Sequence, residues 1–244
     1  MKRLDPQSSI GHPRSAILLL GPTGSGKTPL GEMLQRRGLW GRRCAHFDFG
    51  ANLRRIAAGG RCAGLTPGER AVIRRALRTG ALLQDDEFPI ALKILQSFVA
   101  RRAEPADWLV LNGLPRHAGQ ARGITPVARV SLVVRLLCSP ATALRRIRRN
   151  VAGDRTGRTD DSPAEVRRKL RLFAGRTAPL LDHYAEAGVQ VRCVRVGVAT
   201  RVEDVWRELC ASTPPRRVPE PLVASSAVAE SMSRGPPREP RPAT

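Results

Sequence analysis

Five short apolar runs recur along the chain, and longer stretches with polar and helix-forming residues separate them. Each run has the length of a buried strand. The runs cover residues 16–20, 44–47, 108–111, 130–137 and 189–196. Strands that alternate with helical crossovers predict an α/β fold, in which a five-stranded parallel sheet has helices on both faces. In such sheets, ligands bind at the carboxyl ends of the strands.

The stretches between the runs carry helix signals. Thr66 followed by Glu69 forms a capping-box pattern at a helix start, and Gly80 marks the end of that helix. Further helices are expected over residues 50–58, 85–98, 141–150, 163–187 and 202–210, the longest with a bend near Pro179.

The two ends of the chain differ in composition from the part between them. Residues 1–14 are polar and contain Pro6 and Pro13, and residues 212–244 are rich in Pro, Ser and Ala. Segments of this kind bury too little apolar surface to fold. We therefore expect a disordered leader at 1–14, one folded domain at 15–211 and a disordered tail at 212–244.

The first apolar run leads directly into the sequence GPTGSGKT, which matches G-x-x-x-x-G-K-[ST] at every fixed position. Its glycines let the backbone curl so that successive N–H groups point at a polyphosphate, and the following helix adds its positive end. The lysine places a charge on the β- and γ-phosphates, and the Thr28 hydroxyl is a ligand for Mg²⁺. The predicted nucleotide-binding residues are Gly21, Pro22, Thr23, Gly24, Ser25, Gly26, Lys27 and Thr28. The strand before the loop and the helix after it argue against a chance match, so we predict that the chain binds a nucleoside triphosphate with Mg²⁺.

Composition changes this picture in one respect. The formal net charge is +21, and arginine supplies most of it. Such a charge is typical of proteins that bind polyanions. However, one Tyr and 4% aromatic residues provide no stacking platform for single strands, so we do not expect a nucleic-acid partner. A general bias toward arginine on the surface would explain the same charge.

The cysteines and the N-terminal sequence indicate in which cellular compartment the protein is expected. The five cysteines are widely spaced, and none forms a C-x-x-C pair, so neither a disulfide framework nor a zinc site is expected. No apolar stretch resembles a signal peptide or is long enough to span a membrane. A cytoplasmic protein is the resulting expectation.

Five further motifs follow the phosphate-binding loop in order. They are GANLR at 50–54, GALL at 80–83, LNGLPR at 111–116 with Gln120, RTDD at 158–161, and TAPL at 177–180 with Tyr184. In this order they resemble the motifs of the adenylate kinase family of nucleoside monophosphate kinases. The resemblance runs from about Ala16 to Leu209, and no single motif is decisive by itself.

The resemblance implies a three-layer P-loop NTPase fold with helices that bind the nucleoside monophosphate at about 48–101 and a short lid at about 151–161. It also implies a monomer that transfers the γ-phosphate of ATP to a nucleoside monophosphate, with AMP favoured through Gln120. The acceptor would contact Gly50, Arg54, Leu82, Leu83, Gly113, Arg116 and Gln120. Arg145 would bind ATP, and the catalytic set would be Lys27, Arg116, Arg149, Arg158 and Lys169. Transfer without a covalent intermediate needs two polyanions held in line under cations, which suits these residue types.

The sequence departs from the family pattern at four points. Asn112 stands where the family has an aspartate near Mg²⁺, and Lys169 stands where it has an arginine. The phosphate loop ends in G-K-T-P, and about three extra residues lie between Arg149 and Arg158, which leaves the register of the lid arginines open. From the sequence alone, replacing Asn112 with aspartate is expected to maintain or raise activity.

These departures leave three readings open. The first is an active nucleoside monophosphate kinase. The second is a catalytically weak module that binds or senses nucleotides, which the residues at 112 and 169 favour. The third is a P-loop kinase for another small acceptor, against which Gln120 and the segment 80–83 argue.

Overall fold

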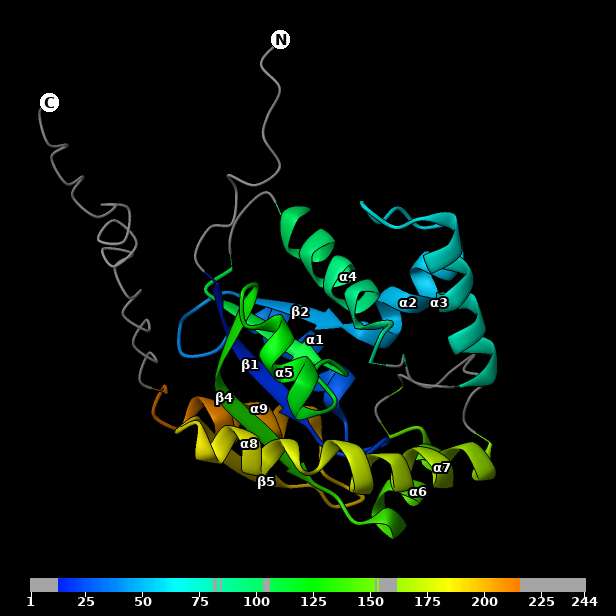
Figure 1. Cartoon of the computed structure of the whole chain (residues 1–244). Coiled ribbons are helices and arrows are strands. Elements are labelled where there is room, and N and C mark those ends of the chain that lie inside the picture. The colour runs from blue at the N-terminus through cyan, green and yellow to red at the C-terminus, as the bar shows by residue number, and fades with distance from the viewer. Residues whose placement is uncertain are drawn as a thin grey trace, which may run out of the picture.

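The computed structural model describes residues 13–80, 83, 85–102, 106–151, 153 and 162–215. Its centre is a parallel sheet in the order β2-β3-β1-β4-β5 (Figure 1). The strands are β1 (Arg14–Leu20), β2 (Cys44–Asp48), β3 (Trp108–Asn112), β4 (Ala128–Leu137) and β5 (Gln190–Arg195). The five predicted strands and their parallel pairing are confirmed. Most of the expected leader, tail and lid lies outside the described residues.

Successive residues of β1, the central strand, point to opposite faces of the sheet, and each face is covered by a layer of helices. Ile17 and Leu19 pack with α1 (Lys27–Arg37) and α9 (Val202–Cys210). Leu18, from the opposite face, belongs to a core that includes α5 (Ala118–Ile124) and α8 (Leu180–Glu186). Figure 1 shows these two helix layers on either side of the sheet. Because the strand is buried on both faces, it reads as a continuous apolar run in the sequence. The fold is the predicted three-layer α/β architecture of a P-loop NTPase.

Three helices lie between β2 and β3 in the chain. They are α2 (Phe49–Ala57), α3 (Pro67–Thr79) and α4 (Phe88–Ala100). The predicted capping box is present, since Thr66 Oγ1 accepts from the Glu69 backbone N–H (3.2 Å) and Glu69 Oε2 accepts from the Thr66 backbone N–H (2.8 Å). Ile56, Ile73 and Ile94 join the three helices to the core on one face of the sheet.

The prediction of one continuous helix over residues 163–187 is wrong. It divides into α7 (Pro163–Leu172), a π-helix η1 (Phe173–Thr177) and α8. The π-turn closes with a bond from the Ala178 backbone N–H to the Phe173 carbonyl (2.8 Å). Gly175 and Thr177 have low helix propensity, and Pro179 has no N–H to continue an α-helical ladder. The α-helix therefore breaks at Phe173, six residues before Pro179, where the sequence predicts a bend.

Both ends of the described domain lie at one edge of the sheet, where the strands begin. β1 starts there, and its Arg14 N–H bonds to the Val127 carbonyl. α1 and α9 run back to the same edge, where Trp40 Nε1 donates to the carbonyls of Leu209 (3.1 Å) and Ser212 (2.7 Å). The carboxyl ends of the strands, where the cavity described below opens, lie at the other edge.

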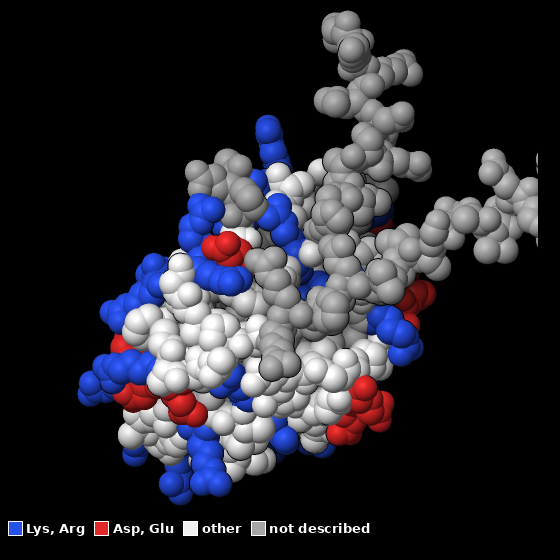
Figure 2. Space-filling model, turned by 90° about the vertical axis from the view of Figure 1, so that its left-hand side faces the viewer, with Lys and Arg blue, Asp and Glu red and all other residues white. Residues whose placement is uncertain are grey.

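Charge is distributed without a dominant patch on the face shown in Figure 2. There, lysine and arginine side chains are dispersed over the surface, with acidic side chains and uncharged areas among them. Among the residues that the structure describes, no helix has both the length and the apolar character needed to cross a membrane.

Candidate functional site

A cavity of about 310 Å³ lies at the carboxyl ends of β1, β2 and β3. Its walls come from the phosphate-binding loop, the start of α2, the end of α3, the loop after β3, and the helices α6 (Pro140–Arg149) and α7. Segments far apart in the sequence meet here because parallel strands end at the same edge of a sheet. The volume is within the range of small-molecule sites.

The phosphate-binding loop forms one wall of this cavity. Gly24 (φ 81°) and Gly26 (φ 95°) adopt left-handed backbone conformations, and a Cβ on Gly24 would lie 2.9 Å from the Ala143 carbonyl oxygen. Glycine is therefore required at Gly24 for both conformation and space. The Lys27 ammonium donates to the carbonyls of Gly21 (2.6 Å) and Pro22 (2.8 Å).

Most of the predicted loop residues line the cavity. They are Gly21, Thr23, Gly24, Gly26, Lys27 and Thr28. Pro22 contributes a carbonyl to Lys27 but does not line the cavity, and Ser25 is buried behind the loop. The loop thus presents one ammonium, one hydroxyl and a curled backbone to the cavity.

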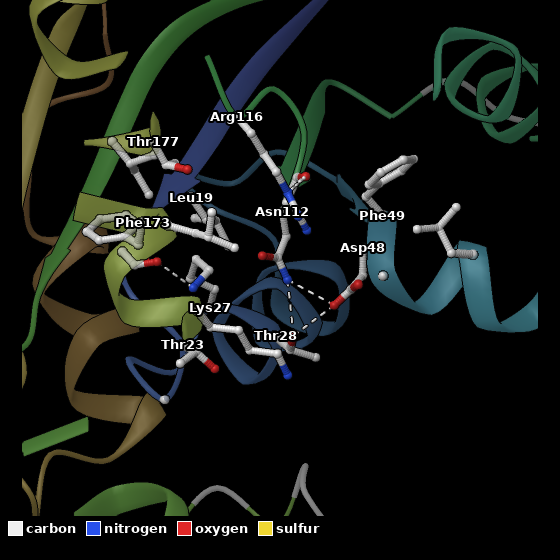
Figure 3. A pocket seen from close by; sticks show the side chains of 18 of the residues that line it. Leu19, Thr23, Lys27, Thr28, Asp48, Phe49, Asn112, Arg116, Phe173 and Thr177 are labelled. Atoms are coloured by element: carbon white, nitrogen blue, oxygen red, sulfur yellow. Dashed lines mark hydrogen bonds between the residues drawn. The ribbon is translucent and has the colours of Figure 1, made fainter. Parts of the chain in front are cut away.

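Three polar side chains meet at the foot of the loop, as the dashed lines of Figure 3 show. The Thr28 hydroxyl donates to Asp48 Oδ2 (2.7 Å), and Asn112 Nδ2 donates both to Asp48 Oδ2 (2.9 Å) and to Thr28 Oγ1 (3.0 Å). The other carboxylate oxygen, Asp48 Oδ1, accepts from the Ala51 backbone N–H (2.8 Å) and caps α2. Both carboxylate oxygens are therefore held in place.

The far side of the cavity combines two arginines with an apolar surface. The Arg116 guanidinium donates to the Gly113 carbonyl (2.8 Å), and its burial lowers its pKa, an effect that Asp48 opposes. Arg54 lines the same side from α2, next to Gly50. The apolar residues of this side are Phe49, Leu53, Ala76, Leu77 and Leu83. This composition suits a ligand that has a phosphate and a flat apolar part.

Gln120 is buried next to this side without lining it. Its Oε1 accepts from the Arg116 backbone N–H (2.9 Å), so the side chain holds the loop that carries Arg116. The structure thus places Gln120 behind the arginine, whereas the family resemblance implies contact with the acceptor base.

Helix α6 presents a different arginine from the one expected. Arg145 and Arg149 are exposed and outside the cavity lining, whereas Arg146 is buried and lines it. The Arg146 guanidinium donates to the carbonyls of Gly24 (3.1 Å), Gly197 (2.8 Å) and Thr200 (2.8 Å). Of these three arginines, the structure therefore places only Arg146 in the described cavity lining. Arg146 follows the buried Ala143 by three residues, which puts both on one face of the helix.

Helix α7 contributes Lys169 to the cavity, as the motif spacing implied. Its neighbour Arg168 donates to the carbonyl of Gly80 at the end of α3 (2.9 Å), so the two positions reach different parts of the site. The π-turn adds Phe173 and Thr177 to the lining. Leu82 and Arg158 lie outside the described residues.

The charge of the described lining is strongly unbalanced. It contains a single carboxylate, Asp48, and five basic side chains, which are Lys27, Arg54, Arg116, Arg146 and Lys169. Such an excess of positive charge favours a polyanionic ligand. Sequence reasoning missed Asp48 and Arg146. The sequence signal for Asp48 was an acidic residue directly at the end of an apolar run, and Arg146 had no signal that separates it from the neighbouring arginines.

The sequence aligns with known proteins over most of its length. An adenylate kinase from Stenotrophomonas maltophilia (strain R551-3) is 32% identical over 192 residues, which are 77% of this chain and 94% of the relative. An adenylate kinase from Hyphomonas neptunium (strain ATCC 15444) is 29% identical over 202 residues, which are 80% and 96% of the two chains. A gluconokinase structure from Sinorhizobium meliloti 1021 covers 82% of this chain and 92% of its own length, with 18% identity and a TM-score of 0.47. No protein-family model matches the chain.

Proposed function

This chain belongs to the adenylate kinase family, and on that premise we propose that it transfers the γ-phosphate of ATP to a nucleoside monophosphate. Membership makes it a phosphotransferase with a nucleotide-binding P-loop. The finer assignment, AMP as the favoured acceptor, rests on the relatives, which are named adenylate kinases. We further propose a monomer in the cytoplasm.

The observation that carries the proposal is the pairing of two phosphate-binding walls across one cavity. The phosphate-binding loop with Lys27 forms one wall, and Arg54 and Arg116 form the other. Guanidinium groups bind phosphate oxygens in a bidentate geometry, so the second wall suits a monophosphate. The apolar residues beside these arginines suit a nucleobase better than a sugar or a small acid. This composition favours the nucleotide acceptor over the other small acceptors.

In the proposed reaction, the chain holds donor and acceptor in line and supplies positive charge. Lys27 exchanges its two loop carbonyls for phosphate oxygens of ATP, and Arg116 orients the acceptor phosphate for attack on the γ-phosphorus. Lys169 adds a positive charge from α7. Arg149 and Arg158 are the remaining members of the proposed catalytic set. Arg146 takes the ATP-binding place that the family resemblance implied for Arg145, because it holds the loop that would surround the phosphates. When bound, Mg²⁺ neutralises charge on the phosphate oxygens.

The hydroxyl and the carboxylate at the foot of the loop fit a magnesium site. Mg²⁺ prefers oxygen ligands and uses one or two carboxylates besides substrate phosphates. Thr28 Oγ1 and Asp48 Oδ2 lie 2.7 Å apart at the cavity wall.

The test is ADP formation from ATP·Mg²⁺ with AMP, CMP, UMP, GMP or dTMP, beside a control without acceptor. We expect rapid turnover with one acceptor, AMP, and slow ATP hydrolysis without one. Binding of ATP without turnover in any reaction would refute the kinase and favour the sensor reading. Turnover with none of the five, but with another small acceptor, would favour the third reading.

Lys27→Ala should remove nearly all turnover, because the charge on the β- and γ-phosphates is lost. Lys93→Ala is a matched control, since Lys93 lies on α4 and pairs with Glu69 (2.7 Å) away from the cavity. A partly exposed ion pair of this kind contributes about 1 kcal/mol or less. A Lys27→Ala enzyme that retained most of its rate would refute the assigned role of the loop.

A further inference from the structure

Asp48 is the only carboxylate in the described lining of the cavity, and the magnesium site of the proposed function depends on it. It ends β2, one strand away from the position where P-loop enzymes of this topology need an acid. In P-loop NTPases, Mg²⁺ is held by the loop Ser or Thr and by an aspartate at the end of a neighbouring strand. β3 ends here in Asn112, which carries no charge.

We propose that the carboxylate of the Mg²⁺ site has moved from β3 to β2. Asp48, with the Thr28 hydroxyl, forms the protein side of that site, and Asn112 is its neutral hydrogen-bond donor. This inference rests on the proposed function, since it requires that ATP·Mg²⁺ binds to the phosphate loop.

The strand register explains how one position can replace the other. Asp48 and Asn112 are paired residues of the parallel ladder between β2 and β3. Their side chains therefore leave the same edge of the sheet, and they meet at 2.9 Å. A carboxylate at either strand end reaches the hydroxyl of Thr28, which begins the helix after β1.

The hydrogen bonds orient these groups for a cation. Thr28 donates its only hydroxyl proton to Asp48 Oδ2, so no proton of this hydroxyl faces the cavity. The Ala51 N–H fixes the other carboxylate oxygen, and the Asn112 amide fixes the first. Two oxygen ligands are thus pre-positioned beside the phosphate-binding loop.

A neutral residue at 112 follows from the same geometry. A second carboxylate 2.9 Å from Asp48 would repel it, and one of the two would have to take up a proton or move. The amide instead donates hydrogen bonds to both neighbours. We therefore expect Asn112→Asp alone to weaken the site, which reverses the expectation from the sequence that this change maintains or raises activity.

The experiment measures ATP affinity by calorimetry in Mg²⁺ and in EDTA, and takes the ratio of the two dissociation constants. The variants are Asp48→Asn, Asn112→Asp and the double exchange, and Asp182→Asn on the exposed face of α8 is the control. Asparagine caps helices as well as aspartate does, so Asp48→Asn keeps the start of α2. Circular dichroism and thermal melts confirm that each variant folds.

Mg²⁺ should tighten ATP binding by the wild-type protein, and we call this factor, the dissociation constant in EDTA divided by that in Mg²⁺, the Mg²⁺ advantage. We expect Asp48→Asn to lower it by about tenfold or more, in the range found when groups that support a metal site are removed. Its affinity in EDTA should stay close to that of the wild type. The double exchange should regain most of the advantage, because it restores one carboxylate to the pair. The paramagnetic resonance of Mn²⁺ with ATP gives a second readout, in which the spectrum of the bound ion should change in Asp48→Asn and not in Asp182→Asn.

An Asp48→Asn variant with the wild-type ratio, or one that loses only affinity for the nucleoside monophosphate, would overturn the inference. A double exchange no better than Asp48→Asn would equally overturn the relocation. These outcomes differ from failure of the proposed function. If ATP binds without turnover, the kinase assignment fails and the Mg²⁺ ratio still tests Asp48. If wild-type protein does not bind ATP, the proposed function is overturned, and this inference with it.

Discussion

Replacement of Arg146 by methionine tests whether this buried arginine joins the phosphate-binding loop to the end of the sheet. Its guanidinium donates to the Gly24 carbonyl in the loop and to the Gly197 and Thr200 carbonyls after β5. Methionine keeps the apolar stem and removes these three bonds, together with a longer one to the Val198 carbonyl (3.4 Å). The change therefore isolates the polar contribution of the side chain.

The expected magnitude follows from these contacts. A hydrogen bond to a charged group contributes about 1.5–3 kcal/mol, but Gly197 is exposed and Thr200 partly so, and their carbonyls can turn to water. Counting about 1 kcal/mol for each of the three shorter bonds gives a loss of about 3 kcal/mol. With a urea slope of about 2 kcal/mol/M, the unfolding midpoint should fall by about 1.5 M.

Urea unfolding, followed by tryptophan fluorescence, measures this shift, and Arg145→Met is the matched control. Arg145 is exposed on the same helix, so its replacement should change the unfolding free energy by less than about 0.5 kcal/mol. Arg146→Met should also raise the KM for ATP, because the loop loses a support. Equal effects of the two replacements would refute the reasoning and show that the phase of α6 is wrong.

Two further predictions concern single side chains. Burial lowers the pKa of His46, against an opposing effect of Asp48, so the unfolded chain takes up a proton first as pH falls. The unfolding free energy should therefore decrease below about pH 6.5, down to the lowered pKa of the folded state, and His46→Gln should flatten this slope in urea titrations at several pH values. An unchanged slope would contradict the assignment. Burial also raises the pKa of the Cys44 thiol to about 12, whereas Cys193 is exposed. At pH 8 a thiol reagent should modify Cys193 in the folded protein and Cys44 only after denaturation, which peptide mass spectrometry would show; rapid labelling of Cys44 would contradict this.

The strands and the phosphate-binding loop could be predicted because their signals are local. A strand buried on both faces must be apolar throughout, and the loop needs its glycines, lysine and hydroxyl at fixed spacing. The same holds for the capping box at Thr66, whose two partners are three residues apart. Each of these features depends on a few consecutive residues.

The sequence could not show which arginine of α6 faces the protein interior, and the reason is physical. Arginine fills four of the five positions from 145 to 149, so the polar face cannot be read from charge. The buried Ala143 sets the phase, but alanine is too common on both faces to show this by itself. Only the packed helix distinguishes Arg146 from its neighbours.

Asp48 could not be assigned because its role depends on strand order. In the sequence it is an acidic residue after an apolar run, 64 residues from Asn112. The two meet only because β2 lies beside β3 in parallel register. The sequence shows the missing charge at position 112 and an acidic residue at the end of an apolar run, but not that these two positions lie side by side.

The position of the two ends of the described domain has a practical consequence. β1 begins, and the segment after α9 passes Trp40, at the edge of the sheet away from the cavity. At about 3.3 Å per residue, the length of the seven-residue β1 separates this edge from the phosphate loop by roughly 23 Å. A tether, tag or fused protein attached at either end of the domain would therefore sit on the side opposite the nucleotides. The domain can be immobilised on a surface, or joined in tandem copies, with the mouth of each cavity facing outward.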